Sequence, residues 1–176
     1  MSDPIDLLRD EHRVILRALD ALERAADRLA RGAALPDGWW ESAVAWLRAF
    51  ADAGHHAKEE RSLFPALVKA GVPSDGGPIG VMLAEHEEGR GYVRAMAEEP
   101  DARRASAARE YASLLRQHID KENDVLFAIA EAVLDEQAQA ALRREFEGVA
   151  VELGREASIA AGEAAVERLA RALDGR

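Results

Sequence analysis

Two pairs of residues in this chain combine a histidine with a glutamate one helical turn later. They are His55 with Glu59, and His118 with Glu122. Side chains four residues apart share one face of a helix, so each pair can point into the same interior. A buried carboxylate is costly unless it is paired or bound to metal, and imidazole with carboxylate suits transition-metal ions. The chain has no cysteine, so any metal site here must use histidine and carboxylate ligands.

Two more histidines, His12 and His86, lie in the middle of apolar stripes elsewhere in the chain. Their apolar neighbours recur at steps of three and four residues, which predicts one buried face of a helix in each case. These stripes comprise Ile5, Leu8, Ile15, Leu19 and Leu22 around His12, and Ile79, Met82, Leu83, Val93 and Met96 around His86.

Four helices are needed to position these side chains. The pattern predicts a helix from Pro4 to near Gly32, a second over about 39–70, a third from Pro78 to Pro100, and a fourth reaching about Leu134. The glycine- and proline-rich stretch 71–78 reads as a loop.

An internal repeat relates the first two helices to the last two. His12 matches His86, and the segment around His55 and Glu59 matches that around His118 and Glu122. Matched residues should occupy matched positions in one bundle. We therefore expect an all-α fold: an antiparallel up-down four-helix bundle over residues 1–134, with an extra C-terminal helical segment, 135–176, packed on it. Gly154 and Gly162 are expected to break that segment.

Composition narrows the choice of partner. Hydrophobic residues make up 48% of the chain and charged residues 32%, with a net charge of −10. This acidic balance disfavours nucleic acid and anionic membranes as partners. The N-terminal stretch is charged, and no stretch is apolar enough to span a membrane, so the expected location is cytoplasmic. A monomer and a homodimer are both compatible with the sequence.

The constellation as a whole matches the needs of two metal ions. Each ion would take two histidine nitrogens and share two bridging carboxylates, leaving room for a bridging oxygen and an exchangeable position. Iron suits these ligands, and zinc, manganese or cobalt could also bind. The six predicted ligands are His12, His55, Glu59, His86, His118 and Glu122.

The same residues carry a family resemblance. The chain resembles the hemerythrin-like, or HHE cation-binding, family over roughly Met1 to Leu134, through Asp10-Glu-His12, the run 54–65, the run 77–86 and the run 117–127. This resemblance implies a non-haem di-iron centre in a four-helix bundle, with an oxo or hydroxo bridge between the irons. Oxygen-carrying hemerythrins add a second histidine one turn after the third-helix ligand, where this chain has Arg90, so the resemblance points away from a simple oxygen carrier.

Several neighbours of the predicted ligands have open roles. His56 and Glu60 are also four residues apart, so periodicity alone leaves them as alternative ligands, but the repeat pairs His55 with His118 and favours His56 and Glu60 as flanking residues. Tyr111, two turns before His118, is either a hydrogen-bond partner of a bound ligand or a core tyrosine. Arg90 either balances charge near the site or reaches outward. Adjacent residues diverge around a helix, so Glu11 and Glu85 are expected in solvent.

Three functions follow from these expectations. The first is a di-iron protein that reacts with dioxygen, peroxide or nitric oxide, in oxidoreductase or detoxification chemistry. The second is an iron- or oxygen-responsive sensor or binding module without turnover. The third is a structural bundle without metal.

Overall fold

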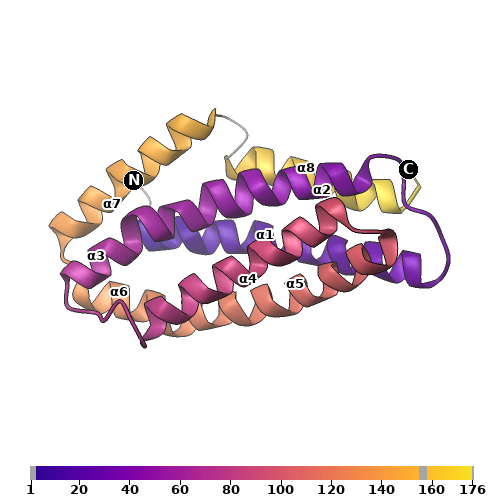
Figure 1. Cartoon of the computed structure of the whole chain (residues 1–176). Coiled ribbons are helices and arrows are strands. Elements are labelled where there is room, and N and C mark those ends of the chain that lie inside the picture. Colours follow the sequence, from indigo (N-terminus) through magenta and orange to yellow (C-terminus); the bar gives the residue numbers. More distant parts are fainter. Residues whose placement is uncertain (1–2, 155–157, 176) are drawn as a thin grey trace.

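The computed structural model describes residues 3–154 and 158–175, and every regular element within those ranges is helical. Four long helical stretches lie side by side and form the bundle (Figure 1). The all-α prediction is therefore confirmed. The bundle is formed by α1 (Pro4–Ala30), the stretch from α2 (Trp39–Trp46) to α3 (Phe64–Lys69), α4 (Pro78–Glu98), and the stretch from α5 (Asp101–Lys121) to α6 (Phe127–Val133).

Local chemistry explains where these helices begin and end. The carboxylate of Asp3 accepts a 2.8 Å hydrogen bond from the backbone N–H of Ile5, and Pro4 occupies the first helical turn. Gly32 adopts φ 75° just after α1, a conformation that favours glycine. Pro78 opens α4, and Pro100 immediately precedes α5. The predicted boundaries agree with these bounds to within a few residues.

The second and fourth stretches depart from regular α-helix where they carry the histidine–glutamate pairs. The second contains the π-helical segments η1 (Leu47–His56) and η2 (Glu59–Leu63), and the fourth contains η3 (Glu122–Leu126). Because π-helical turns are rare and concentrate at functional sites, their positions here mark the two motifs. A period of 3.6 residues could not reveal these wider turns.

The predicted ligands form a polar layer that divides the apolar core into two clusters. Along α1, His12 lies between Leu8, which belongs to one cluster, and Ile15, which belongs to the other. Along α4, His86 similarly separates Met82 from Val93. Tight apolar packing on both sides keeps this layer away from bulk water.

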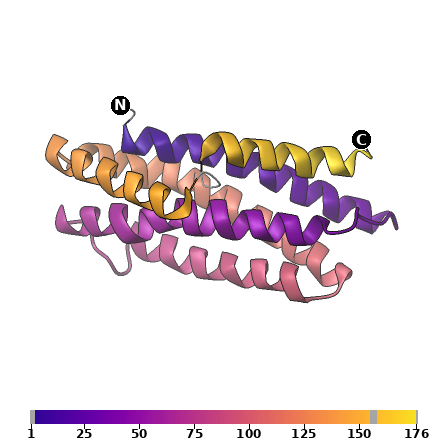
Figure 2. The same cartoon turned by 90° about the horizontal axis from the view of Figure 1, so that it is seen from above.

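The C-terminal segment forms two helices, α7 (Glu136–Leu153) and α8 (Ile159–Leu173). Gly154 ends α7 as expected, whereas Gly162 lies inside α8 and does not break it. The indole N–H groups of Trp39 and Trp46 donate to the backbone oxygens of Leu169 and Gly162, which fixes α8 against α2. Figure 2 shows α8 lying alongside α1.

None of the described helices combines the length and the apolar character that crossing a membrane requires.

Candidate metal centre

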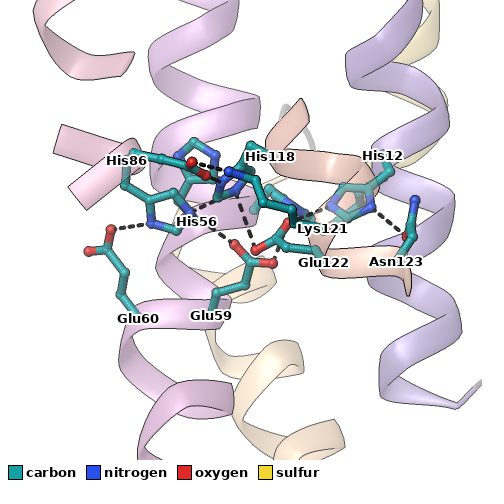
Figure 3. Close-up of polar contacts among 12 residues, drawn as sticks. His12, His56, Glu59, Glu60, His86, His118, Lys121, Glu122 and Asn123 are labelled. Atoms are coloured by element: carbon teal, nitrogen blue, oxygen red, sulfur yellow. Dashed lines mark hydrogen bonds and ion pairs between the residues drawn. The ribbon is translucent and has the colours of Figure 1, made fainter. Parts of the chain in front are cut away.

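The four helical stretches bring all six predicted ligands to one place in the middle of the bundle. Figure 3 labels five of them: His12, Glu59, His86, His118 and Glu122. His12 comes from α1, His86 from α4 and His118 from α5, while His55 and Glu59 come from η1 and η2. Each of these side chains is at most 1% exposed, as is that of Glu122 in η3. Six ionisable side chains thus meet in a dry interior, which is costly unless a cation compensates the carboxylates.

The side chains form two overlapping groups of ligand atoms. In each group, one atom from every residue lies within 4.8 Å of the corresponding atoms of the others. Glu59 belongs to both groups, so one carboxylate joins them. The groups are His12, His55, Glu59 and Glu122, and His56, Glu59, His86 and His118.

The two glutamates lie between the histidines in a bridging arrangement. Glu59 Oε1 is 3.4 Å from His55 Nε2, and its Oε2 is 3.5 Å from His86 Nε2. Glu122 Oε2 is likewise 3.1 Å from His12 Nε2, and its Oε1 is 3.3 Å from His118 Nε2. Each carboxylate therefore offers one oxygen to a histidine of each group.

A second set of side chains forms hydrogen bonds with Nδ1 of the four predicted histidine ligands, the ring nitrogen that faces away from the centre. His55 Nδ1 donates to Glu11 Oε2 at 2.9 Å, and His118 Nδ1 donates to Glu85 Oε2 at 2.9 Å. His86 Nδ1 donates to Glu60 at 2.7 Å, and His12 Nδ1 to the amide oxygen of Asn123 at 3.0 Å (Figure 3). In a neutral imidazole, such a bond favours the tautomer with the proton on Nδ1, which would leave Nε2 free for a metal ion.

Glu11 and Glu85 correct the expectation that both would be in solvent. Glu11 is buried and accepts a hydrogen bond from the buried ammonium of Lys58. Glu85 is 16% exposed and accepts one from Lys121. Each glutamate reaches across to a predicted ligand histidine on a neighbouring helix, a contact that the period of a single helix does not predict.

Unpartnered polar atoms show that the site fits a cation. Among the described residues, both oxygens of Glu59, Oε1 of Glu122 and Nε2 of His55 are buried without a hydrogen bond. Where Nδ1 carries the proton, the Nε2 lone pair faces a carboxylate oxygen, and two acceptors in contact need a proton or a metal ion between them. The donor set of nitrogen and oxygen atoms is one that iron, zinc and manganese all accept.

The histidines differ in charge state because burial and the nearby carboxylates shift their pKa values in opposite directions. Burial lowers the pKa of His86, but the nearby carboxylates of Glu59 and Glu60 outweigh burial and raise the pKa to about 9. Burial lowers the pKa of His55 to about 3, so this imidazole is neutral at pH 7. Without a metal ion, protons on some of the histidines thus compensate the carboxylates.

Comparison with protein families identifies the family to which the bundle belongs. Residues 3–130 match the profile of the hemerythrin HHE cation binding domain. The chain belongs to this family. The match covers the whole bundle except its last few residues, and it confirms the resemblance that the sequence motifs carry. No curated protein and no solved structure gives a significant match to the chain.

Within this HHE domain, His56 lies closer to the centre than the repeat suggested. Its ring is 4% exposed and stacks on that of His86, with 3.9 Å between the ring centroids. His56 belongs to the same group of ligand atoms as Glu59, His86 and His118. Glu60, by contrast, is not in either group of ligand atoms, and it contacts Nδ1 of His86.

Arg90 lies beside the HHE centre and is tied to two acidic side chains. Its guanidinium donates to Asp52 at 2.9 Å and to Glu60 at 2.7 Å. Arg90 thus balances negative charge around the site, which was one of its two open roles. The hydrogen bonds from His86 and Arg90 outweigh partial burial and hold the pKa of Glu60 at about 2.

A cavity of about 160 Å³ adjoins the centre and is lined in part by His56, His86 and Tyr111. Tyr111 is buried, and no described residue forms a hydrogen bond with its hydroxyl. Burial raises the pKa of Tyr111 well above its usual value, so the phenol keeps its proton at neutral pH. Gly89 allows the close approach of the tyrosine ring, since an added Cβ would lie 3.3 Å from it.

Proposed function

We propose that this HHE domain binds two iron ions and that its centre reacts with a small oxygen or nitrogen species: dioxygen, peroxide or nitric oxide. The ligands would be His12, His55, Glu59, His86, His118 and Glu122. The observation that carries the proposal is the pair of ligand groups joined by Glu59, whose two oxygens have no other partner among the described residues. Iron bound there would supply redox chemistry and an exchangeable position for a small molecule.

The surrounding side chains hold the ligands in a binding-ready arrangement. Glu11, Glu85, Glu60 and Asn123 keep a proton on Nδ1 of the four histidines, so Nε2 faces the centre. Such outer contacts orient the imidazole and raise its basicity. The two apolar clusters exclude water from the layer between them.

Size and polarity support a small reactant. A cavity of about 160 Å³ is smaller than the roughly 300–1,000 Å³ of pockets that hold drug-sized ligands. It therefore suits a molecule of a few heavy atoms better than a large organic substrate. Tyr111, whose protonated hydroxyl has no partner among the described residues, is positioned to donate a hydrogen bond to a molecule in this cavity. We assign it this positioning role.

Rapid mixing tests the reaction directly. The protein loaded with ferrous iron is mixed separately with dioxygen, hydrogen peroxide and nitric oxide, while absorption is followed in the visible range. We expect at least one reagent to give a saturable spectral change that is absent from the Glu59→Gln variant. An iron-loaded protein that responds to none of the three would refute the proposed reaction while leaving metal binding intact.

A sensor without turnover is the second candidate, and one contact favours it. Phe50 lies in η1, five residues before His55, and its ring packs against Gly162 of α8. A change at the ligands could thus reach the C-terminal helices. Limited proteolysis with and without bound iron tests this idea: faster cleavage of α7 and α8 in the metal-free protein supports a sensor, and equal rates refute it.

A further inference from the structure

We propose that His56 is a fifth histidine ligand, so that the two metal ions have different surroundings. One ion would have three imidazoles, from His56, His86 and His118, and the other would have two, from His12 and His55. This inference rests on the proposed di-metal function and adds a ligand that the four-histidine motif does not contain. It follows from the orientation of His56, from the internal repeat and from the shape of the backbone.

The orientation of His56 follows that of the other four histidines. Each of those rings turns Nδ1 outward to a polar side chain and Nε2 inward to a carboxylate. His56 Nδ1 likewise lies on the side of Asp52, 3.6 Å from its Oδ1. At that length the contact is too long to be a good hydrogen bond, so it does not account for a buried imidazole. Nδ1 of His56 is accordingly buried without a hydrogen bond, and by analogy with the other four rings Nε2 would be the ligand atom.

The repeat shows that the surroundings of His56 differ from the matched surroundings of Ile119 at several neighbouring positions. The register that pairs His55 with His118 places Ile119 opposite His56, Leu115 opposite Asp52 and Asn123 opposite Glu60. The register that pairs His12 with His86 places Leu16 opposite Arg90. The half that contains His56 thus has a histidine and three charged residues where the other has apolar or neutral ones.

These four residues contact one another or the same ligand, so they form one unit. Arg90 bonds both Asp52 and Glu60, and Glu60 bonds His86. His56 belongs to the second ligand group, and Glu60 contacts His86 of that group. Four matched differences that converge on one of two metal positions indicate that this position has a distinct ligand set.

The backbone differs between the halves at the same place. η1 is π-helical over Leu47–His56, whereas the matching part of the fourth stretch remains α-helical through Lys121. A π-helical turn holds more residues than an α-helical turn, so adjacent side chains diverge less. This geometry lets His55 and His56 both point into the interior, where they are 1% and 4% exposed.

Proton NMR of the protein loaded with cobalt(II) counts the bound imidazoles. Each imidazole that binds cobalt through Nε2 keeps a proton on Nδ1, and the resonance of that proton moves far outside the normal range. We expect five such resonances that disappear in D₂O. The His56→Ile variant, which installs the residue found at the matched position 119, should show four. The control variant Ile119→Val should keep all five.

The outcomes separate this inference from the proposed function. Two bound cobalt ions with only four shifted resonances in the unaltered protein, unchanged in the His56→Ile variant, would overturn the fifth ligand and leave the di-metal centre standing. Failure to bind cobalt would overturn both. If the variant does not fold, the count in the unaltered protein still decides between five ligands and four.

Discussion

His55 donates a hydrogen bond of 2.9 Å from Nδ1 to Oε2 of Glu11, and both side chains are almost fully buried. The other oxygen of Glu11 accepts a hydrogen bond from Lys58, which is buried as well. The internal repeat reproduces this arrangement with His118, Glu85 and Lys121, but there the lysine is 42% exposed. The chain therefore contains two matching sets of a histidine, a glutamate and a lysine, which differ mainly in how far the lysine is buried.

We predict that Glu11→Gln destabilises the metal-free protein far more than Glu85→Gln does. Removing the charge of Glu11 leaves the buried ammonium of Lys58 without its counter-ion, a change that typically costs about 3–5 kcal/mol. Lys121 can turn to water, so Glu85→Gln should cost less than about 1 kcal/mol. Urea unfolding of both variants measures the difference. Equal losses would show that burial of the lysine is unimportant.

The same two variants should weaken metal binding by similar factors. Each removes the carboxylate that orients a ligand histidine, and such losses typically lower metal affinity by about 10–100-fold. Competition with a chromophoric chelator measures the affinity of each variant for cobalt(II). Unchanged affinity in both variants would contradict the orienting role of Glu11 and Glu85.

Much of this architecture could be predicted from the amino-acid sequence. Apolar residues at steps of three and four located the four helices, because these helices bury one face along most of their length. The repeat and the two histidine–glutamate pairs identified six residues that the structure brings together. Proline and glycine located the ends of the helices, since their backbone restrictions act locally.

Features that depend on a change of helical period or on contacts between helices could not be predicted in this way. His56 was interpreted as a flanking residue because the repeat pairs His55 with His118 and so places Ile119 opposite His56, whereas the π-helical η1 lets both histidines be buried. Glu11 and Glu85 were assigned to solvent because their burial comes from a lysine and a histidine on another helix. The placement of α8 depends on Trp39 and Trp46, whose indole bonds to it leave no periodic signal.

A substitution at Gly162 should test how tightly α8 is held. A Cβ at this position would clash with Cε2 of Phe50, whose ring is buried and stacked on Trp46. We expect Gly162→Ala to destabilise the protein by about 1–3 kcal/mol, because the ring has little room to move. Thermal unfolding is the measurement.

Gly148 provides the control for that experiment. It lies within α7, and an added Cβ there would meet nothing within 4 Å. Gly148→Ala should therefore stabilise the protein by about 0.5–1 kcal/mol, the usual gain on replacing a glycine inside a helix. If Gly162→Ala behaved like Gly148→Ala, the close packing of α8 on Phe50 would be refuted.

Metal binding should release protons at neutral pH. The pKa of His86 in the metal-free protein is about 9, above its ordinary 6.5, and the pKa values of His12 and His118 are also raised. The protonated form of His86 therefore stabilises the metal-free protein below about pH 6.5, and this contribution is lost as the pH rises through 9. A metal ion displaces the same proton, so affinity should increase between pH 6.5 and 8.5.

Calorimetric titration with cobalt(II) at pH 7, in two buffers with different ionisation enthalpies, counts the released protons. We expect net release at pH 7 that becomes smaller at pH 8.5. The absence of release at pH 7 would mean that the histidines are already neutral in the metal-free protein.

Replacing Tyr111 should affect reactivity more than stability. Its hydroxyl has no hydrogen-bond partner among the described residues, so Tyr111→Phe should change the unfolding free energy by less than about 0.5 kcal/mol. Loss of one hydrogen bond to a molecule in the cavity should slow its reaction by about tenfold, which corresponds to about 1.4 kcal/mol. Tyr92→Phe, which alters a partly buried tyrosine whose hydroxyl donates to Glu88, serves as the control. Equal rates in the two variants would remove Tyr111 from the proposed site.

The most direct test of the di-metal centre is the number of metal ions that each chain holds. The protein and its Glu59→Gln variant are loaded anaerobically with ferrous iron, separated from free metal and analysed for bound metal. The arrangement of ligands predicts two ions per chain in the unaltered protein and a clear loss in the variant, because Glu59 belongs to both groups. A chain that binds no transition metal, or a variant that retains both ions, would contradict the centre described here.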